Sequence, residues 1–441
     1  MKNKINIINK IKPFKKIIEV SGDKSISIRS ILLASQAIGT SKIYNLLESE
    51  DVINTLKSIK KLGINFKRKK KYYEIYGFGL SGYKSKSNTV INAGNSGTLA
   101  RLILGLLVNL KNSVTIKGDN SLSRRDFSRI TDPLKNFGAI IKSKNNGLPV
   151  KIKGSSYLRP INYFEKLGSA QCKSSVMMAA IKTPGITKIK AKPSRNHTEI
   201  LFKQLKLPIK IIKKKNFDLI ELHGISEFKS FNYVVPGDIS SCSFFIVLTL
   251  LSKNSILTIR NVNTNKTRTG IIKILNKMGA NIILMNKRVY KGEEISDIKI
   301  KSGINLKAIN CPEKLNSSAI DEFLVIFLVA AKAKGISKFK NLTELNKKES
   351  PRLNIAVNFL KEIGIKVERN KDDIKIYGNP NLNIKKEIKI KNYMKDHRIF
   401  MMSCVAALVL GGKFEIYDSD SIQTSFPNFL KILTNIGAKI N

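Results

Sequence analysis

Several helix-like segments begin with small polar residues and carry a cation just inside the segment. The small residues and the cations that follow them are Gly22 with Lys24 and Arg29, Gly97 with Arg101, and Ser169 with Lys173. A fourth segment, VPGDISSCSFF, begins in the same way without a cation. The first N–H groups of a helix lack partners within the helix, and its dipole is positive there, so such ends bind phosphate or carboxylate. N-capping alone explains any one segment, but the four together favour a site for an anionic ligand.

The second half of the chain places carboxylates beside cations. The segments are AIDEF at 319–323, KESPRL at 348–353 and DHRIFM at 396–401. Taken alone, the Asp321-Glu322 pair is typical of a helix cap or a solvated surface, and Pro351 suits the first turn of an ordinary helix. The same geometry puts Glu349 just before a helix and Arg352 in its first turn, beside an end that attracts anions.

An apolar helix that ends in Gly and runs into a short strand recurs along the chain. The glycines are Gly63, Gly138, Gly279, Gly364 and Gly437, and a sixth copy carries Leu207-Pro208 where the others carry Gly. Gly just past a helix end supplies the left-handed conformation that closes the helix, and Pro also stops a helix. The copies recur at similar spacing, which predicts six repeated units.

Each unit also contains a second apolar helix, which opens from a small-residue loop, and β-branched segments such as SVTIKG, SILTIRNV and KFEIYD. We therefore expect an α/β fold whose units run strand, helix, strand, helix, strand, strand. Solenoid repeats are usually shorter and propellers are nearly all strand, so two globular domains of three units each are the economical arrangement. Crossings near Val20–Gly22 and Pro236–Gly237 would give one discontinuous domain, residues 1–21 and 237–441, and a second domain, residues 22–236.

Composition narrows the class of protein. A chain of 441 residues with 42% apolar residues can bury real cores, which excludes wholesale disorder. The four cysteines share no CxxC spacing and His197 and His223 are isolated, so we expect no disulfide framework, no metal site and no cofactor. Apolar runs such as Phe323–Ala331 are shorter than the roughly 18 to 20 residues of a membrane helix. The basic N-terminus lacks a signal core, so we expect a cytoplasmic protein with no membrane partner.

The charge of +47, from 79 basic and 32 acidic residues, raises the possibility of a nucleic-acid partner. A dedicated nucleic-acid binder concentrates its basic residues on one face or in a tail, with aromatic residues between them. Here the lysines are spread from end to end among many isoleucines and asparagines, which indicates solvated faces and AT-rich coding bias. This distribution disfavours nucleic-acid binding, although a positive field would still attract small anionic substrates.

A series of motifs makes a resemblance specific. In order they are SGDKSISIRS (21–30), GNSGTLAR (94–101), GDNSLSRRDF (118–127), SAQCKSS (169–175), SRNHTE (194–199), PGDISS (236–241), NKTRTG (265–270), AIDEF (319–323), KESPRL (348–353), DHRIFM (396–401) and TSFP (424–427). One such motif is weak, but eleven in the same order over nearly the whole chain are strong. The chain resembles the 5-enolpyruvylshikimate-3-phosphate synthase family, in its second bacterial class.

The resemblance implies a fold and a reaction. The fold is the enolpyruvyl transferase fold, a two-domain inside-out α/β barrel with three βαβαββ units in each domain and the active site in the cleft between them. The reaction is transfer of the enolpyruvyl group of phosphoenolpyruvate to the 5-hydroxyl of shikimate 3-phosphate, with release of phosphate, on the way to chorismate and the aromatic amino acids. Both substrates carry phosphate and carboxylate groups, so their site needs several fixed cations. We expect a monomer with these two small molecules as its partners.

The resemblance also assigns residues by their match to the family motifs. The shikimate 3-phosphate ligands would be Lys24, Ser25, Arg29, Ser169, Ala170, Gln171, Arg195, Asp321 and Lys348. The phosphoenolpyruvate ligands would be Lys24, Gly97, Arg125, Gln171, Arg352 and Arg398. Asp321 matches the acceptor of the 5-hydroxyl proton, and Glu349 and Lys24 match the groups credited with proton transfer at the methylene carbon. His397 would share in the proton transfer, and Gly97 would leave space for the small ligand.

Two rival interpretations stay open at this point. The UDP-N-acetylglucosamine enolpyruvyl transferases share the fold and need a reactive cysteine in a basic loop, and Cys172 is followed by Lys173. The GDKS and KES motifs nevertheless favour shikimate 3-phosphate. An RNA-binding protein of related architecture is suggested by the charge alone, and strong salt-dependent RNA retention without enzyme activity would favour it.

Overall fold

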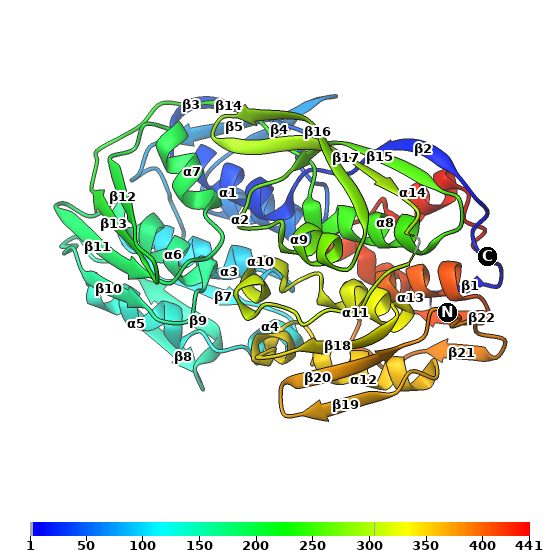
Figure 1. The fold of residues 1–441 in the computed structure, drawn as a ribbon. Coiled ribbons are helices and arrows are strands. Elements are labelled where there is room, and N and C mark those ends of the chain that lie inside the picture. The colour runs from blue at the N-terminus through cyan, green and yellow to red at the C-terminus, as the bar shows by residue number, and fades with distance from the viewer. Residues whose placement is uncertain (1–2, 304) are drawn as a thin grey trace. The chain divides into compact units, whose positions relative to one another are not determined.

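The computed structural model describes residues 3–303 and 305–441, which form two compact units (Figure 1). The inserted unit comprises Gly22–Val235 and Tyr290–Glu293. The terminal unit comprises Met1–Ser21, Pro236–Val289 and Glu294–Asn441. No sequence pattern indicated that the short segment Tyr290–Glu293 would join the inserted unit.

Three four-stranded sheets of one topology build the inserted unit. Their strand orders are β14-β3-β5-β4, β6-β7-β9-β8 and β10-β11-β13-β12. The strands are β3 (Ile38–Tyr44), β4 (Phe66–Arg68), β5 (Tyr72–Phe78), β6 (Thr89–Asn92), β7 (Val114–Lys117), β8 (Ile140–Lys144), β9 (Gly147–Lys153), β10 (Asn162–Glu165), β11 (Ile186–Ala191), β12 (Ile209–Lys213), β13 (Asp218–His223) and β14 (Asn232–Val234). In each sheet the first two strands are parallel and the remaining pairs are antiparallel.

The helices of the inserted unit connect these strands in pairs. They are α1 (Lys24–Ala34), α2 (Glu50–Lys61), α3 (Gly97–Leu106), α4 (Asn120–Ser123), α5 (Ser128–Asn136), α6 (Ala170–Ala180) and α7 (His197–Gln204). A parallel pair of strands needs a crossover, which a helix supplies, whereas an antiparallel pair needs only a hairpin. Each sheet therefore belongs to one strand, helix, strand, helix, strand, strand unit. In the first of these repeats the leading strand is β14, which follows the other strands of the inserted unit in the sequence.

The terminal unit repeats this plan. Its sheets have the orders β16-β17-β15-β2, β18-β20-β19 and β1-β22-β21. The strands are β1 (Lys4–Ile7), β2 (Lys15–Glu19), β15 (Ile256–Asn263), β16 (Asn281–Tyr290), β17 (Glu293–Lys301), β18 (Gly335–Phe339), β19 (Val367–Asn370), β20 (Asp373–Gly378), β21 (Glu387–Ile390) and β22 (Lys413–Tyr417). Isolated parallel bridges from Lys307 and Asn310 to Lys334 and Lys338 stand where the middle sheet would have its first strand.

The helices of the terminal unit occupy the corresponding positions. They are α8 (Ile239–Leu251), α9 (Gly270–Lys277), α10 (Asn316–Ala319), α11 (Phe323–Lys332), α12 (Arg352–Glu362), α13 (His397–Leu410) and α14 (Phe429–Ile436), with the 3-10 turns η1 (Glu313–Leu315), η2 (Thr343–Lys347) and η3 (Ser419–Thr424). None of the helices in residues 3–303 and 305–441 is long and apolar enough to span a membrane.

Each unit has its own hydrophobic core, in which helices lie inside and sheets outside. Every residue from Ile239 to Leu250 in α8 and from Phe323 to Ala331 in α11 is buried. A helix that is apolar on all sides must be surrounded by protein. Strands such as β11, with the sequence ITKIKA, instead alternate exposed and buried residues, so one face of the sheet packs on helices and the other faces water. This is the inside-out arrangement expected from the resemblance.

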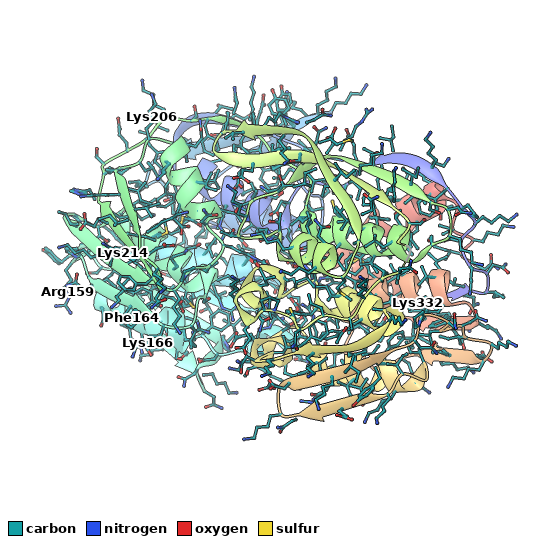
Figure 2. All side chains as sticks on the ribbon, in the orientation of Figure 1. Arg159, Phe164, Lys166, Lys206, Lys214 and Lys332 are labelled. Carbon is teal, nitrogen blue, oxygen red and sulfur yellow. The ribbon has the colours of Figure 1, made fainter. Side chains whose placement is uncertain are left out.

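The helix ends that recur along the chain share a residue in the left-handed conformation. The glycines have φ angles of 84° at Gly63, 111° at Gly138, 88° at Gly279, 86° at Gly364 and 121° at Gly437. At the sixth helix end the left-handed residue is Lys206, with φ of 57° (Figure 2). The N–H of Leu207 then donates to the carbonyl of Phe202, as the N–H of Ile64 donates to Ile59 after Gly63. Placing Leu207-Pro208 at the Gly position was therefore wrong by one residue.

Candidate active site

In the inserted unit, the N-terminus of α1 carries the first predicted ligand cation. Asp23 caps the helix, and its carboxylate accepts the N–H of Ile26 over 2.9 Å. The ammonium of Lys24 lies 2.8 Å from the carboxylate of Asp51 on α2. Lys24 is therefore held at the helix end, where the dipole also favours an anion.

Arg29 is buried one turn further along α1, with an exposed fraction of 3%. Its Nε donates to the hydroxyl of Thr198 over 2.7 Å, and its Nη2 donates to the hydroxyl of Ser174 over 3.1 Å. Its Nη1 donates to the carbonyl of Ser25 over 3.0 Å. Three elements, α1, α6 and α7, thus hold this guanidinium in a fixed position.

Gly97 opens α3 beside two guanidinium groups. A Cβ atom at this position would lie 2.8 Å from Nη1 of Arg101 and 3.2 Å from Nη1 of Arg125. The Nη2 of Arg125 donates to the side-chain oxygen of Asn95 over 3.2 Å, and Asn95 donates to Asp119 over 2.6 Å. From the sequence, Gly97 was expected to leave space for a small ligand. The structure adds that a side chain here would displace the two arginines.

The N-terminus of α6 brings together Ser169, Ala170 and Gln171. The hydroxyl of Ser169 accepts the N–H of Cys172 over 3.3 Å, so Ser169 caps the helix that Ala170 begins. Gln171 is hydrogen-bonded to two residues of α3, Arg101 and Thr98. The start of α6 is therefore tied to the start of α3, and the predicted ligands of both helices lie in one neighbourhood.

Two other residues singled out in the sequence have buried carboxylate partners. Lys173, whose side chain is fully buried, lies 2.5 Å from Glu199. The Nδ1 of His197 lies 2.6 Å from the carboxylate of Glu293, and both side chains are buried. These contacts favour structural roles, so Lys173 is not one of the cations that face a ligand. Arg195, a predicted ligand, is half-buried just before α7.

In the terminal unit, Arg352 lies at the centre of a cluster of carboxylates. Its side chain is 1% exposed, and its Nε is 2.8 Å from Asp396. Its Nη1 is 3.5 Å from Asp321, and its Nη2 is paired with Glu349. The hydroxyl of Ser350 also donates to Asp396 over 2.8 Å. The segment that begins α12 is thereby locked to the start of α13, and two predicted catalytic carboxylates meet at one guanidinium.

These contacts move the ionisation equilibria of the buried pair. Burial raises the pKa of Asp396, but the charge and hydrogen bond of Arg352 and the charge of His397 together outweigh it and hold the pKa below its ordinary value. Burial alone would lower the pKa of Arg352, but the carboxylates of Asp396 and Glu349 outweigh it and raise the pKa. Arg352 and Asp396 are therefore both charged at neutral pH.

Arg398, in the first turn of α13, approaches the same cluster from another side. Its Nη1 donates to the carbonyl of Asp321 over 2.8 Å and lies 3.9 Å from the carboxylate of Glu322. The carboxylate of Asp321 is 3.4 Å from the ammonium of Lys348. Glu322 is fully buried and accepts a hydrogen bond from the hydroxyl of Ser240. Five predicted residues of the terminal unit, Asp321, Lys348, Glu349, Arg352 and Arg398, are thus linked by contacts with Asp321 or Arg352.

His397 also lies at the start of α13, but its described contact is with a residue outside the cluster of carboxylates. Its Nδ1 is 3.2 Å from the hydroxyl of Thr424, and the ring is buried, with an exposed fraction of 4%. This geometry suits a residue that fixes the start of α13. A part in proton transfer stays a prediction.

Sequence reasoning missed several residues that hold the predicted ligands in place. Asn95 and Thr98 lie in the same motif as Gly97 and contact Arg125 and Gln171. Their position in the GNSGTLAR motif could have identified them from the sequence. Glu322 follows Asp321 directly, but only the fold brings it beside Arg398.

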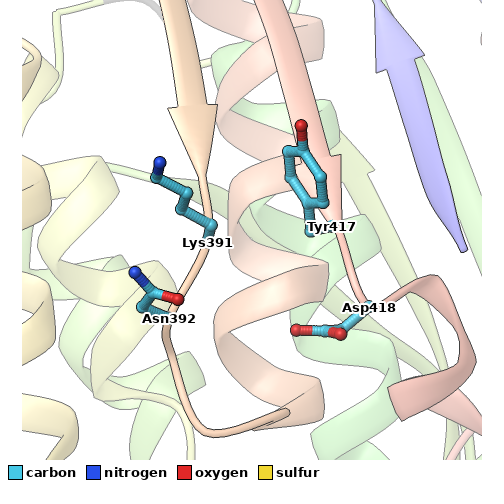
Figure 3. Close-up of a pocket in the computed structure, with 4 residues that line it drawn as sticks. All are labelled: Lys391, Asn392, Tyr417 and Asp418. Carbon is cyan, nitrogen blue, oxygen red and sulfur yellow. The ribbon is translucent and has the colours of Figure 1, made fainter. Parts of the chain in front are cut away.

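One surface hollow lies away from these residues. It is lined by Lys391, Asn392, Tyr417 and Asp418, at the ends of β21 and β22 (Figure 3). None of the four is a predicted ligand. Among residues 3–303 and 305–441, no group of three or more His, Cys, Asp or Glu side chains is placed to hold a metal ion.

The environment of Cys172 bears on the rival transferase. Its side chain is buried in α6, and burial raises the pKa of the thiol. A reactive cysteine needs an accessible thiolate with a lowered pKa. Cys172 therefore lacks the environment that the UDP-N-acetylglucosamine enolpyruvyl transferase interpretation requires.

Comparison with known proteins agrees with this geometry. The family model for EPSP synthase (3-phosphoshikimate 1-carboxyvinyltransferase) matches residues 8–433. The chain is 43% identical to the 3-phosphoshikimate 1-carboxyvinyltransferase of Ruthia magnifica over 96% of both chains, and 35% identical to that of Zymomonas mobilis over 98% of this chain and 96% of the other.

Solved structures confirm the fold. An EPSP synthase from Acinetobacter baumannii is 34% identical, with a TM-score of 0.87 over 99% of both chains. The enolpyruvyl transferase NikO from Streptomyces tendae, 13% identical, has a TM-score of 0.79 over 100% of this chain and 99% of the other, which shows a shared fold alone. The two-domain enolpyruvyl transferase fold predicted from the sequence is confirmed, and the chain belongs to the EPSP synthase (3-phosphoshikimate 1-carboxyvinyltransferase) family.

Proposed function

We propose that this chain transfers the enolpyruvyl group of phosphoenolpyruvate to the 5-hydroxyl of shikimate 3-phosphate and releases phosphate. The observation that carries the proposal is the family match over residues 8–433, which includes all of the predicted ligands. Several of the predicted ligands lie in the first turn of a helix, where anions bind, among them Lys24, Gly97, Ala170, Arg352 and Arg398. Both substrates are anions, so the chemistry of the site suits them.

Binding of shikimate 3-phosphate is assigned mainly to the inserted unit. The residues are Lys24, Ser25, Arg29, Ser169, Ala170, Gln171 and Arg195, with Asp321 and Lys348 from the terminal unit. The contacts of Arg29 with Ser174 and Thr198 support this role, because they hold the guanidinium in one orientation. The backbone N–H groups at the start of α6 would add donors for phosphate.

Binding of phosphoenolpyruvate is assigned to residues of both units. They are Lys24, Gly97, Arg125, Gln171, Arg352 and Arg398. Arginine suits this task, since its planar fork binds carboxylate and phosphate through two parallel hydrogen bonds. The fixed positions of Arg352 and Arg398 support the assignment, because a site that is already ordered loses less entropy on binding.

The chemistry needs two proton transfers. The 5-hydroxyl oxygen of shikimate 3-phosphate adds to C2 of phosphoenolpyruvate and loses its proton to Asp321, while C3 gains a proton and becomes a methyl group. The tetrahedral intermediate then loses phosphate, and C3 returns one proton, which restores the double bond. Glu349 and Lys24 are assigned to the transfers at C3. The surrounding cations would stabilise the leaving phosphate.

The test is a direct assay of the purified protein with both substrates, following phosphate release and enolpyruvyl product together. The proposal predicts product with one equivalent of phosphate. Turnover with UDP-N-acetylglucosamine instead of shikimate 3-phosphate would overturn it in favour of the related transferase. No turnover with either acceptor substrate, together with salt-dependent retention on RNA, would favour the RNA-binding alternative.

Several finer expectations stay predictions. They are the cleft site between the domains, the monomeric state, the cytoplasmic location and the absence of a nucleic-acid partner. If residues of both units act on one substrate pair, ligand binding should draw the units together. Solution scattering with and without both ligands measures this, and an unchanged radius of gyration would contradict it.

A further inference from the structure

Arg101 and Thr98 hold the side-chain amide of Gln171 from two sides. Arg101 lies in the second turn of α3, and its Nη1 donates to Oε1 of Gln171 over 2.7 Å. The Nε2 of Gln171 donates to the hydroxyl of Thr98, in the first turn of α3, over 2.9 Å. Gln171 itself lies in the first turn of α6. Both atoms of the amide therefore have a partner on the neighbouring helix.

The two partners decide which way the amide points. A guanidinium has only hydrogen-bond donors, so the Gln171 atom that faces Arg101 must be the oxygen. A flipped amide would place its NH2 group against the guanidinium and would lose a hydrogen bond to a charged group. Arg101 consequently directs the NH2 group away from itself. Thr98 accepts from this group, and an NH2 group carries a second hydrogen that can bond an anionic oxygen.

Arg101 is held in place by its own surroundings. Its guanidinium lies over the ring of Phe127, 5.0 Å from the ring centroid. The backbone of Gly97 leaves room for Nη1, which a Cβ atom would approach to 2.8 Å. The hydroxyl of Ser175 donates to the carbonyl of Arg101 over 2.8 Å and ties this part of α3 to α6. The orientation of Gln171 thus depends on a side chain that is fixed before any ligand arrives.

We propose that Arg101 is a positioning residue, which fixes Gln171 as a hydrogen-bond donor toward the anionic substrate. Arg101 was noted in the sequence as a cation behind Gly97, but it has no place among the predicted ligands. The proposal rests on the proposed function, because it takes Gln171 as a ligand of shikimate 3-phosphate. It differs from direct binding in that the effect of Arg101 passes through Gln171.

A double-mutant cycle separates these two routes. Binding of shikimate 3-phosphate, without phosphoenolpyruvate, is measured by calorimetry for the full chain and for Arg101→Met, Gln171→Met and the double variant. Each single change is expected to weaken binding about tenfold, which is the loss of roughly one charge-assisted hydrogen bond. The double variant is expected to bind no more weakly than Gln171→Met alone, because Arg101 then has no amide to orient.

Two further variants keep the test decisive if Arg101→Met folds poorly. Arg101→Lys retains a charge and a donor and is expected to bind within about threefold of the unchanged protein. Gln171→Glu still pairs with Arg101 but donates nothing to the ligand, so it is expected to bind more weakly than Gln171→Met. Thermal unfolding of every variant identifies losses that come from misfolding.

The outcomes are distinct. If Arg101→Met weakens binding equally in the unchanged protein and in Gln171→Met, the proposal is overturned, because Arg101 then acts on the ligand directly. Unchanged binding in Arg101→Met would overturn it as well. If the unchanged protein binds shikimate 3-phosphate but forms no product with phosphoenolpyruvate, the proposed function fails while the cycle still decides the role of Arg101. No binding by the unchanged protein would overturn both.

Discussion

The two units hold their buried cations in different ways. In the terminal unit, Arg352 donates to the carboxylates of Asp396 and Glu349. In the inserted unit, Arg29 donates to two hydroxyls and a carbonyl. Carboxylates fix a guanidinium strongly but offset its charge, and they are also groups that exchange protons. Hydrogen bonds to neutral oxygens fix a guanidinium less strongly. In the proposed mechanism, the carboxylates Asp321 and Glu349 of the terminal unit transfer protons, whereas most of the proposed shikimate 3-phosphate ligands lie in the inserted unit.

A buried lysine of the inserted unit extends this comparison. Lys182 donates to the carbonyls of Leu80 over 2.7 Å and Leu106 over 2.8 Å, and to the side chain of Asn109 over 3.2 Å. Burial lowers its pKa to about 7, whereas the carboxylates around Arg352 raise the pKa of that group. The same burial therefore has opposite net effects, depending on whether the acceptors carry charge.

The largest expected effect is on catalysis in the terminal unit. Glu349→Ala should lower kcat about 10²- to 10⁴-fold, the range that a general acid or base contributes. Binding of shikimate 3-phosphate should persist, because the cationic residues proposed to bind it lie mainly in the inserted unit. Glu344→Ala, an exposed glutamate paired with Lys347, is the matched control and should leave kcat unchanged. Near-normal turnover of Glu349→Ala would remove Glu349 from the mechanism.

Stability should separate the two kinds of buried arginine. Arg352→Met leaves the buried carboxylate of Asp396 without its partner and should lower the free energy of unfolding by about 3–5 kcal/mol. Arg29→Met removes hydrogen bonds to two hydroxyls and a carbonyl and should lower it by about 1–3 kcal/mol. Denaturant unfolding of both variants measures the difference. Equal losses would show that the charge of the acceptors does not matter here.

The Arg352–Asp396 pair predicts a loss of stability at acid pH. The pKa of Asp396 is lower in the folded state than its ordinary value of 3.8, so the folded state binds this proton less readily than the unfolded state. The stabilisation is therefore complete above the ordinary value and is lost as the pH falls through the lower folded pKa. This loss should be absent in Arg352→Met, in which the pKa is no longer held down.

Lys182 should make the inserted unit respond to alkaline pH. Between its folded pKa of about 7 and its ordinary value of 10.5, the unfolded state holds a proton that the folded state lacks. Stability should therefore rise with pH in this window, by up to about 1.4 kcal/mol per pH unit. Lys182→Met should remove this rise, whereas Lys188→Met, at an exposed position of β11, should keep it. Parallel pH profiles for Lys182→Met and the unchanged protein would contradict the lowered pKa.

Substitution of Arg398 tests whether a guanidinium that lies beside carboxylates can still bind phosphoenolpyruvate. Arg398→Met should raise the KM for phosphoenolpyruvate about 10- to 100-fold, because hydrogen bonds to charged groups are lost. The KM for shikimate 3-phosphate should change by less than about threefold, since Arg398 is not among its assigned ligands. Steady-state kinetics with each substrate varied in turn measures both constants. Equal increases in the two KM values would show that Arg398 supports the structure of the site as a whole and does not bind phosphoenolpyruvate specifically.

The smallest effect concerns the repeated helix ends. Lys206→Gly should stabilise the inserted unit by about 1 kcal/mol, because a left-handed conformation is strained for residues other than Gly. Gly364→Lys in the terminal unit should do the opposite, and no atom within 4 Å of a new Cβ there would complicate the result. Thermal unfolding of both variants measures this. A destabilised Lys206→Gly would mean that the lysine side chain has a packing role.

Local signals predicted the repeats, and long-range contacts set the limits of prediction. The glycine caps could be found because a left-handed residue at a helix end is a local requirement. Lys206 was missed because the neighbouring Pro208 is itself a helix stop. The partner of Arg101 lies on another helix, and nothing in the sequence near Arg101 indicates Gln171. The pairing of His197 with Glu293 likewise depends on Tyr290–Glu293 belonging to the inserted unit.

The order of strands has a consequence for how the chain folds as it is synthesised. β14 pairs with β3, so the first sheet of the inserted unit is complete only when residues 232–234 have left the ribosome. β1 pairs with β22, so this strand waits for a partner that lies far along the chain. Until then its unpaired edge is open to pairing with other chains. The inserted unit can therefore close before β22 is made, whereas the terminal unit cannot.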